Sequence, residues 1–303
     1  MYKSLAEIVE TGKMSGKGFW QVVLEDDIKE RGITFDEGFR QMKDMYLAMK
    51  QADAAYDDKL RSASGMVGTD GGRLEAARIA GGSICGNFMM KVMEKAIKMG
   101  ESNACMKRIV AAPTAGSCGV IPAVLISMEE EFGYSVDEIT KGLIVAAGIG
   151  GVIAQRAFLA GAAGGCQAEI GSASAMAAGA AACLKGADGD RIIQAAAIAL
   201  KNLLGLACDP VGGLVEVPCV KRNTIGAVGA LTAADMALAG VDSKIVPDEV
   251  IDAMRSIGVA MPSCIKETGN GGLAVTPCAK AMMEKLSQKE TETENCCDMP
   301  PVK

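Results

Sequence analysis

The chain has 303 residues, a net charge of −6 and no histidine, and 50% of its residues are hydrophobic while only 4% are aromatic. That length supports one large hydrophobic core or two smaller ones. An acidic chain without a stripe of basic and aromatic residues is a poor candidate for nucleic-acid binding. Without histidine, the commonest metal ligand and the commonest general base are both missing, so any metal must be held by thiolate or carboxylate groups.

The N-terminus lacks the basic-then-apolar layout of a signal peptide, and the longest apolar stretch, 142–154, is too short to span a bilayer. We therefore expect a cytoplasmic protein with no membrane segment. The 11 cysteines then indicate reduced thiols and not a disulfide framework.

Apolar residues follow a helical period along nearly the whole chain, and 37 glycines with abundant alanine indicate closely packed helices. We predict an all-α fold with one large helical domain over residues 1–289 and a flexible C-terminal tail at 290–303. Ser4 with Glu7, and Ser135 with Glu138, have the spacing of capping boxes that begin helices. Beyond the N-terminal helix, the expected helices cover residues 36–61, 74–99, 117–131, 135–160, 172–184, 191–204, 224–239, 247–258 and 277–289.

Two of these helices carry further expectations. Gly81 and Gly82 should loosen or kink the helix at 74–99. The helix at 135–160 has little polarity and several glycines, which predicts that other helices surround it.

Three cysteines lie where glycine or proline interrupts a helical pattern. Cys166 follows two glycines, Cys208 precedes Asp-Pro, and Cys219 follows Val-Pro. A metal ligand must be held on backbone that turns inward, and three thiolates without a fourth leave a metal position open for a substrate. The three are too far apart in sequence to match ferredoxins or zinc ribbons, so three packed, inert thiols are the alternative.

A turn rich in glycine and hydroxyl groups, Ala-Pro-Thr-Ala-Gly-Ser-Cys-Gly at 112–119, precedes an apolar helix. Its free backbone N–H groups and the hydroxyls of Thr114 and Ser117 can bind a small anion, for which a substrate carboxylate is the natural candidate. A plain helix N-cap is the alternative. Two further glycine-rich segments, 62–72 and 263–272, could close over a ligand.

Together these segments resemble the α chain of the iron–sulfur L-serine dehydratases (L-serine ammonia-lyases), from Ser4 to about Leu286. The resemblance rests on five pieces in order. They are the turn at 112–119, Gly-Gly-Cys-Gln-Ala-Glu at 164–169, Cys-Asp-Pro-Val at 208–211, Val-Pro-Cys-Val-Lys-Arg-Asn at 217–223 and Thr-Gly-Asn-Gly-Gly-Leu-Ala at 268–274.

The resemblance implies a 4Fe-4S cluster held by Cys166, Cys208 and Cys219, with one iron left free to bind the hydroxyl and carboxylate of L-serine. That iron would act as a Lewis acid on the departing hydroxide, in a β-elimination that yields pyruvate and ammonia. Some relatives carry a cysteine near the C-terminus that could cap this iron. Cys278 lies in that region, but a further helix follows it here, so the role is not transferred.

In this family the α chain pairs with a β domain, which we expect to be a separate β subunit here. The general base is not identified in the sequence, and it could belong to that partner because this chain has no imidazole. The residues expected to bind the substrate are Thr114, Ser117, Cys118 and Gly119, with Ser64 of the loop at 62–72 beside them.

Other functions fit parts of the pattern. A related iron–sulfur β-eliminase would act on L-cysteine, as a desulfidase, or on L-threonine. A pyridoxal-phosphate deaminase would use Lys266, with the glycines at 269–272 holding the phosphate, and would need an α/β fold. A helical binding module without enzyme activity would contain merely packed cysteines.

Overall fold

The computed structural model describes residues 2–297, and it describes side chains as far as Gln288. Its α-helices, in chain order, are α1 (Leu5–Ser15), α2 (Phe19–Arg31), α3 (Phe35–Ala54), α4 (Asp70–Ile79), α5 (Gly86–Ala104), α6 (Val120–Phe132), α7 (Val136–Arg156), α8 (Gly161–Gly164), α9 (Ser172–Leu184), α10 (Gly189–Lys201), α11 (Cys219–Leu238), α12 (Pro247–Ala260) and α13 (Pro277–Cys297). Short helical turns of other types cover Gln167–Gly171, Val211–Gly213, Ser263–Ile265 and Gly272–Val275.

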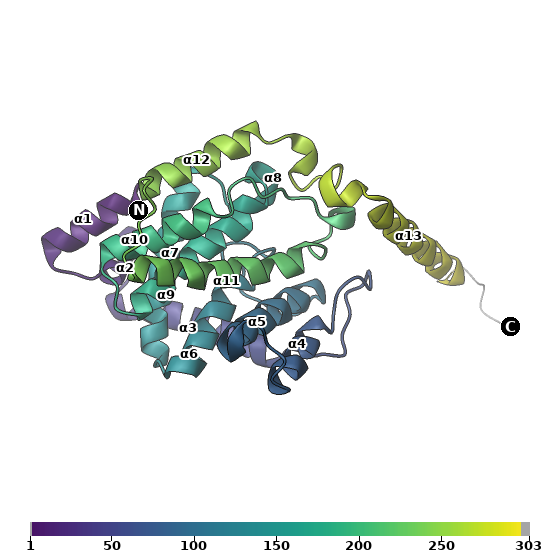
Figure 1. Cartoon of the computed structure of the whole chain (residues 1–303), viewed down its shortest axis with the longest axis horizontal. Helices are drawn as coiled ribbons and strands as arrows, with labels where there is room; N and C mark the ends of the chain where they lie inside the picture. Colours follow the sequence, from purple (N-terminus) through teal and green to yellow (C-terminus); the bar gives the residue numbers. More distant parts are fainter. Residues whose placement is uncertain (1, 298–303) are drawn as a thin grey trace.

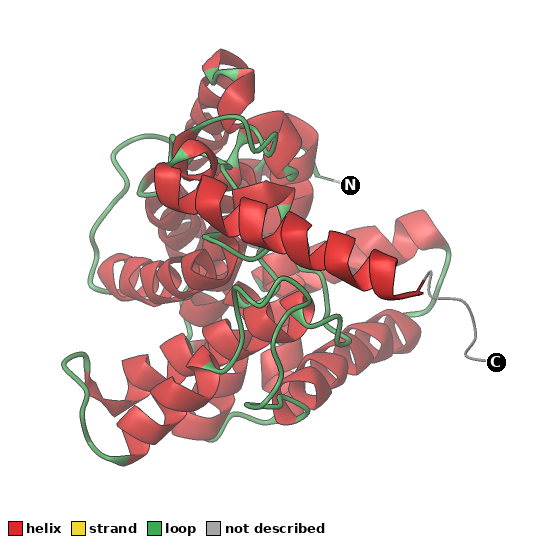
Figure 2. Cartoon of the chain, turned by 90° about the vertical axis from the view of Figure 1, so that its right-hand side faces the viewer, coloured by secondary structure: helices red, strands yellow, loops and turns green. Residues whose placement is uncertain are grey.

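The all-α prediction is confirmed. Over residues 2–297 there is no strand, and the one β-type pairing is an isolated bridge between Cys208 and Lys266 (Figure 2). The alternative of a pyridoxal-phosphate deaminase is therefore wrong in the fold it required. None of the described helices combines the length and the apolar character needed to cross a membrane.

Helix α9 forms the centre of the core, and α6, α7, α10 and α11 pack around it (Figure 1). All its residues from Ser172 to Ala182 are buried, and most of them are alanine. A Cβ atom at Gly179 would lie 2.2 Å from Ile149 Cδ1 of α7, so the two helices approach closely because the side chain is missing. Small residues thus allow the close packing that the composition predicted.

The helix at 135–160 is expected to be surrounded by other helices, and this is confirmed: the corresponding α7 packs against α2, α3, α6, α9 and α12. Helix α9 is buried more completely still. Helix α7 also ends earlier than expected, at Arg156, where the backbone leaves the helical region at Ala157 (φ −138°, ψ −130°).

Both predicted capping serines begin a helix. Ser135 Oγ accepts a hydrogen bond from Glu138 N at 3.3 Å, and the Glu138 carboxylate accepts one from Ser135 N at 2.8 Å, which completes the box. Ser4 Oγ accepts from Glu7 N at 3.0 Å, whereas the Glu7 carboxylate accepts from the backbone of Lys3 instead. The first box is therefore only half formed.

Other helix boundaries also differ from the prediction: α3 ends at Ala54 and not at 61, and α11 begins at Cys219 and not at 224. The helix expected at 74–99 is two helices, α4 and α5, because Gly81 (φ 76°) and Gly86 (φ 80°) adopt left-handed conformations that reverse the chain. Helix α13 continues past Lys289 to Cys297, so the last helix is longer than expected. Part of the predicted tail, residues 298–303, lies outside the described residues.

Helix α13 projects from the body of the molecule (Figure 1). Among its described side chains, only Ala279 is fully buried. It packs on the turns Val211–Gly213 and Gly272–Val275, which adjoin the segments that carry Cys208 and Lys266. The chemistry-bearing loops therefore lie at the same end of the molecule as this helix.

Candidate metal centre

Three segments bring the predicted thiols together. Cys166 immediately precedes the π-helical turn Gln167–Gly171, which leads into α9. Cys208 lies in the loop after α10, where its N–H donates to Ile265 O at 2.9 Å and its carbonyl accepts from Glu267 N at 2.7 Å. Cys219 is the first residue of α11.

The three thiols are free and buried, with exposures of 3%, 3% and 8% for Cys166, Cys208 and Cys219. Burial raises the pKa of the Cys166 thiol to about 11 and that of the Cys219 thiol to about 12. Burial also raises the pKa of Cys208, and the neighbouring Cys166 and Cys219 add to this effect, because three thiolates here would repel one another. If all three thiols are ionised, their negative charges require a positively charged partner.

Arg222 is the protein's own cation at this site. Its guanidinium donates to Ala207 O at 2.7 Å and to Asp209 Oδ1 at 2.8 Å, the two neighbours of Cys208. It also hydrogen-bonds the thiol of Cys166 and lowers the pKa of that group, against the larger effect of burial. One side chain of α11 therefore joins the segments of two candidate ligands.

Asn223 joins the third candidate ligand to the turn at 112–119. Its Nδ2 donates to Cys219 O at 3.0 Å and to Gly116 O at 2.9 Å, and its Oδ1 accepts from Gly119 N at 2.8 Å. The side chain is 1% exposed. This amide fixes the predicted substrate-binding turn against the start of α11.

Glu169 places a carboxylate between the thiols and that turn. Its Oε2 lies 4.0 Å from Cys208 Sγ, and the hydroxyl of Thr114 hydrogen-bonds to the carboxylate. Burial raises the pKa of Glu169 above its usual value. Glu169 belongs to the motif at 164–169, but the sequence alone assigns it no role. It is the single charged residue between Ala157 and Leu184, and that was a usable signal.

The turn at 112–119 differs in part from its prediction. Thr114 Oγ1 and Ser117 Oγ lie 3.1 Å apart, with Thr114 against Glu169. The N–H of Cys118 donates to Ala115 O at 3.3 Å and that of Gly119 to Asn223, so neither is free to bind an anion. The Cys118 thiol is fully buried and donates to Met99 O at 3.7 Å. Of the four residues predicted in this turn, Thr114 and Ser117 keep hydroxyl groups that suit a substrate carboxylate, and Ser117 is fully buried.

Ser64 lies in the glycine-rich loop, which packs against the segment before Cys219. Ser62 Oγ donates to Glu216 Oε2 at 2.8 Å, and Ser64 donates to the same oxygen. The buried Glu101 holds the far end of the loop, since its carboxylate accepts from the backbone N–H groups of Gly68, Asp70 and Gly71 at 2.9–3.1 Å. The loop is anchored at both ends, and Ser64 as a substrate ligand remains a prediction.

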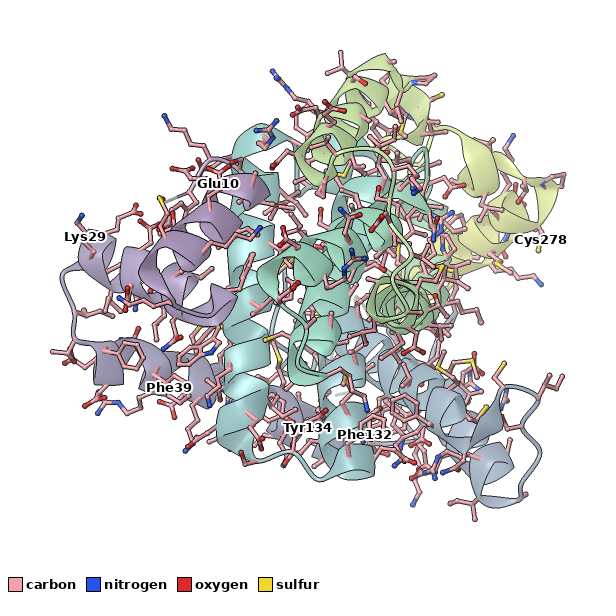
Figure 3. All side chains as sticks on the ribbon, turned by 60° about the vertical axis from the view of Figure 1, so that its left-hand side comes forward. Glu10, Lys29, Phe39, Phe132, Tyr134 and Cys278 are labelled. Carbon is pink, nitrogen blue, oxygen red and sulfur yellow. The ribbon has the colours of Figure 1, made fainter. Side chains whose placement is uncertain are left out.

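Cys278 is exposed and lies near the start of α13, at the edge of the molecule in Figure 3. Lys266 pairs through its backbone with Cys208, so this lysine is at the site, although its expected role required a different fold.

The donor set fits an iron–sulfur cluster better than a single ion. Among the described residues, no three cysteine, aspartate or glutamate side chains lie close enough to hold one metal ion. A cluster places each thiolate on a different iron, so its ligands are further apart than the ligands of one ion. Three buried thiols, with Cys166 raising the pKa of the other two and one arginine beside them, are compatible with this wider spacing.

The fold and the site define an all-helical protein with a buried three-thiol centre. A family model described as the serine dehydratase alpha chain matches residues 14–274. The chain is 41% identical over 300 residues to the probable L-serine dehydratase, alpha chain, of Bacillus subtilis (strain 168), covering 97% of this chain and 100% of that one. It therefore belongs to the serine dehydratase alpha chain family.

Two further relatives differ in length. The L-serine dehydratase, alpha chain, of Peptoniphilus asaccharolyticus is 41% identical over 90% of this chain and 94% of its own. The L-serine dehydratase of Streptomyces coelicolor is 46% identical over 182 residues, which are 59% of this chain but 40% of that protein. Relatives thus include proteins of matching length and one that extends well beyond the matched region.

Proposed function

We propose that this chain is the α subunit of an L-serine dehydratase, which converts L-serine to pyruvate and ammonia. In the reaction the Cα–H and Cβ–O bonds break and water leaves, and the resulting aminoacrylate tautomerises and is hydrolysed. The observation that carries the proposal is the convergence of Cys166, Cys208 and Cys219 in a chain of this family.

We propose that these three thiols hold a 4Fe-4S cluster. When bound, the cluster would supply an iron with an open position that acts as a Lewis acid toward the substrate hydroxyl. Arg222 would offset part of the negative charge of the thiolates through its contact with Cys166. Free thiols and such a cluster suit the reducing cytoplasm.

The chain's own residues would orient the amino acid. The hydroxyls of Thr114 and Ser117 are held close together and lie beside Glu169. To bind a substrate carboxylate next to the thiols, each would exchange its present acceptor for the substrate. Ser64, anchored on Glu216 near the start of α11, would close the site from the other side. Fixing the carboxylate fixes Cα–H relative to the base.

We propose a β subunit as the partner. The relatives that match this chain over its whole length are named alpha chains, and the longer relative has additional residues beyond the shared region. The general base could come from that subunit, because this chain has no histidine.

The test is an anaerobic assay of pyruvate and ammonia release with L-serine, L-threonine and L-cysteine. The cluster-loaded chain is measured alone and with the candidate β chain. We expect activity with L-serine that requires the partner and disappears on exposure to air. Full activity after aeration and chelation would rule out the cluster, and full turnover by the α chain alone would rule out a base on the partner.

A further inference from the structure

We infer that Glu169 binds the α-ammonium group of the amino-acid substrate. The inference rests on the proposed function, because it assigns one more part of the same substrate. It also explains why an enzyme of this kind would select amino acids over the corresponding hydroxy acids.

Glu169 lies between the groups expected to hold the two ends of the substrate. The Glu169 carboxylate lies 4.0 Å from the thiol of Cys208 and is hydrogen-bonded by Thr114. The thiols would hold the metal that binds the hydroxyl, and Thr114 belongs to the turn expected to bind the carboxylate. In an α-amino acid the ammonium group is attached to the carbon between these two groups, so Glu169 lies where that group must be.

The charge of Glu169 is not compensated by a cation of the part of the protein that the structure describes. Two buried carboxylates are paired with cations: Asp209 with Arg222 at 2.8 Å, and Glu94 with Arg78 at 2.7 Å and with Lys98 at 2.6 Å. The buried Glu101 has no such pair, but it accepts three backbone N–H groups. Among the described residues, Glu169 pairs with no lysine or arginine, and the charged group that acts on it is the carboxylate of Glu267. A partly buried carboxylate beside another negative charge is unfavourable, and a cationic ligand offsets that cost.

The surroundings of the Glu169 carboxylate limit the size of a ligand. A Cβ atom at Gly116 would lie 3.1 Å from Glu169 Oε1, and one at Gly161 would lie 2.9 Å from Glu169 Oε2. Glycine at both positions lets the backbone of two segments approach the carboxylate closely, so the surroundings of Glu169 are tight. A small group such as an ammonium suits this setting, whereas a bulky cation does not.

The test compares two ligands that differ in one group. L-Alanine carries the ammonium but no leaving group, and L-lactate has a hydroxyl in its place. Calorimetric titration of the anaerobic, cluster-loaded αβ complex gives both dissociation constants without relying on turnover. We expect the wild-type complex to prefer L-alanine and Glu169→Gln to reduce that preference at least about tenfold, because the buried charge partner is lost.

Two variants make the result specific. Glu169→Asp keeps the charge on a shorter side chain and should retain most of the preference. Glu267→Gln removes a neighbouring negative charge and should not reduce the preference, which separates a direct contact from a general change of potential. The iron content of every variant is measured, so that loss of the cluster is not mistaken for loss of the contact.

The outcomes separate the inference from the function on which it rests. A wild-type complex without preference for L-alanine, or a Glu169→Gln complex with unchanged preference, overturns the inference even if pyruvate is formed. A Glu169→Gln complex that loses turnover but keeps the preference assigns this residue to another step, and also overturns it. If the preference behaves as expected but L-serine yields no pyruvate, the proposed function fails and the ammonium contact stands.

Discussion

In the core around α9, neighbouring helices meet through alanine and glycine, whereas around the three thiols irregular segments are joined by polar side chains. The contact between Gly179 and Ile149 represents the first region. Gln167 represents the second: it is fully buried, donates to Gly164 O at 2.9 Å and Met254 O at 3.1 Å, and accepts from Gly205 N at 2.9 Å. The core depends on the volume of its side chains and the site on hydrogen bonds between distant segments.

The largest loss of stability should follow from removing one side chain that hydrogen-bonds separate segments of the site. Asn223→Ala leaves Gly119 N and Gly116 O without their buried partner and removes the side-chain bond to Cys219 O. Unpaired buried groups of this kind cost about 1–3 kcal/mol each, so we expect a loss of stability of about 2 kcal/mol or more. Iron binding should weaken as well, because Cys219 loses its tie to the turn.

Chemical denaturation and an iron count measure both effects. Asn202→Ala, at an exposed asparagine that ends α10, is the matched control and should change stability by less than about 0.5 kcal/mol. An Asn223→Ala protein as stable as this control would show that the site does not depend on hydrogen bonds between its segments.

Overfilling the core should have the next largest effect. Gly179→Leu inserts a side chain where even a Cβ would lie 2.2 Å from Ile149, and overpacking costs about 1–3 kcal/mol. Thr232→Leu, at an exposed position of α11, is the control and should be nearly neutral. If thermal melting showed equal stability for the two variants, the close approach of α7 and α9 would be wrong.

The smallest effect should come from a helix cap remote from both regions. Ser135→Ala removes the acceptor for Glu138 N and should destabilise the protein by about 1 kcal/mol without changing its iron content. The hydrogen bonds from Ser135 hold the pKa of Glu138 below its usual value. The stability from this carboxylate is therefore present above its unfolded pKa and is lost as the pH falls through the lower folded value. In urea titrations, the difference between the two proteins should shrink from neutral to acidic pH but not vanish, because the hydrogen bond from Glu138 N to Ser135 Oγ does not titrate.

Local patterns could predict the helices because each helix depends mainly on its own residues. The range 172–184 coincides with α9, and the capping serine at 135 begins α7. The glycines at 81 and 82 marked a weak point, but their pattern could not distinguish a kink from the complete break that the left-handed Gly81 and Gly86 produce. Such a break depends on how the following helix packs.

The site could be predicted only in part. The breaks around Cys166, Cys208 and Cys219 indicated inward-facing thiols, and the structure brings the three together. The N–H of Gly119 could not be recognised as already paired, because its partner Asn223 lies 104 residues further along the chain. Glu169 stood out as a charge among small residues, but its meaning depends on Thr114 and Cys208, which reach it only in the fold.

The most direct test of the central claim is an iron count on the anaerobically reconstituted chain and its single variants Cys166→Ser, Cys208→Ser and Cys219→Ser. Cys183→Ser, at a partly buried thiol elsewhere, is the control, and circular dichroism confirms that each variant keeps its helices. We predict about four irons per chain in the wild type and the control, and well below one in each of the three variants. Wild-type iron content in any one of the three would contradict the account.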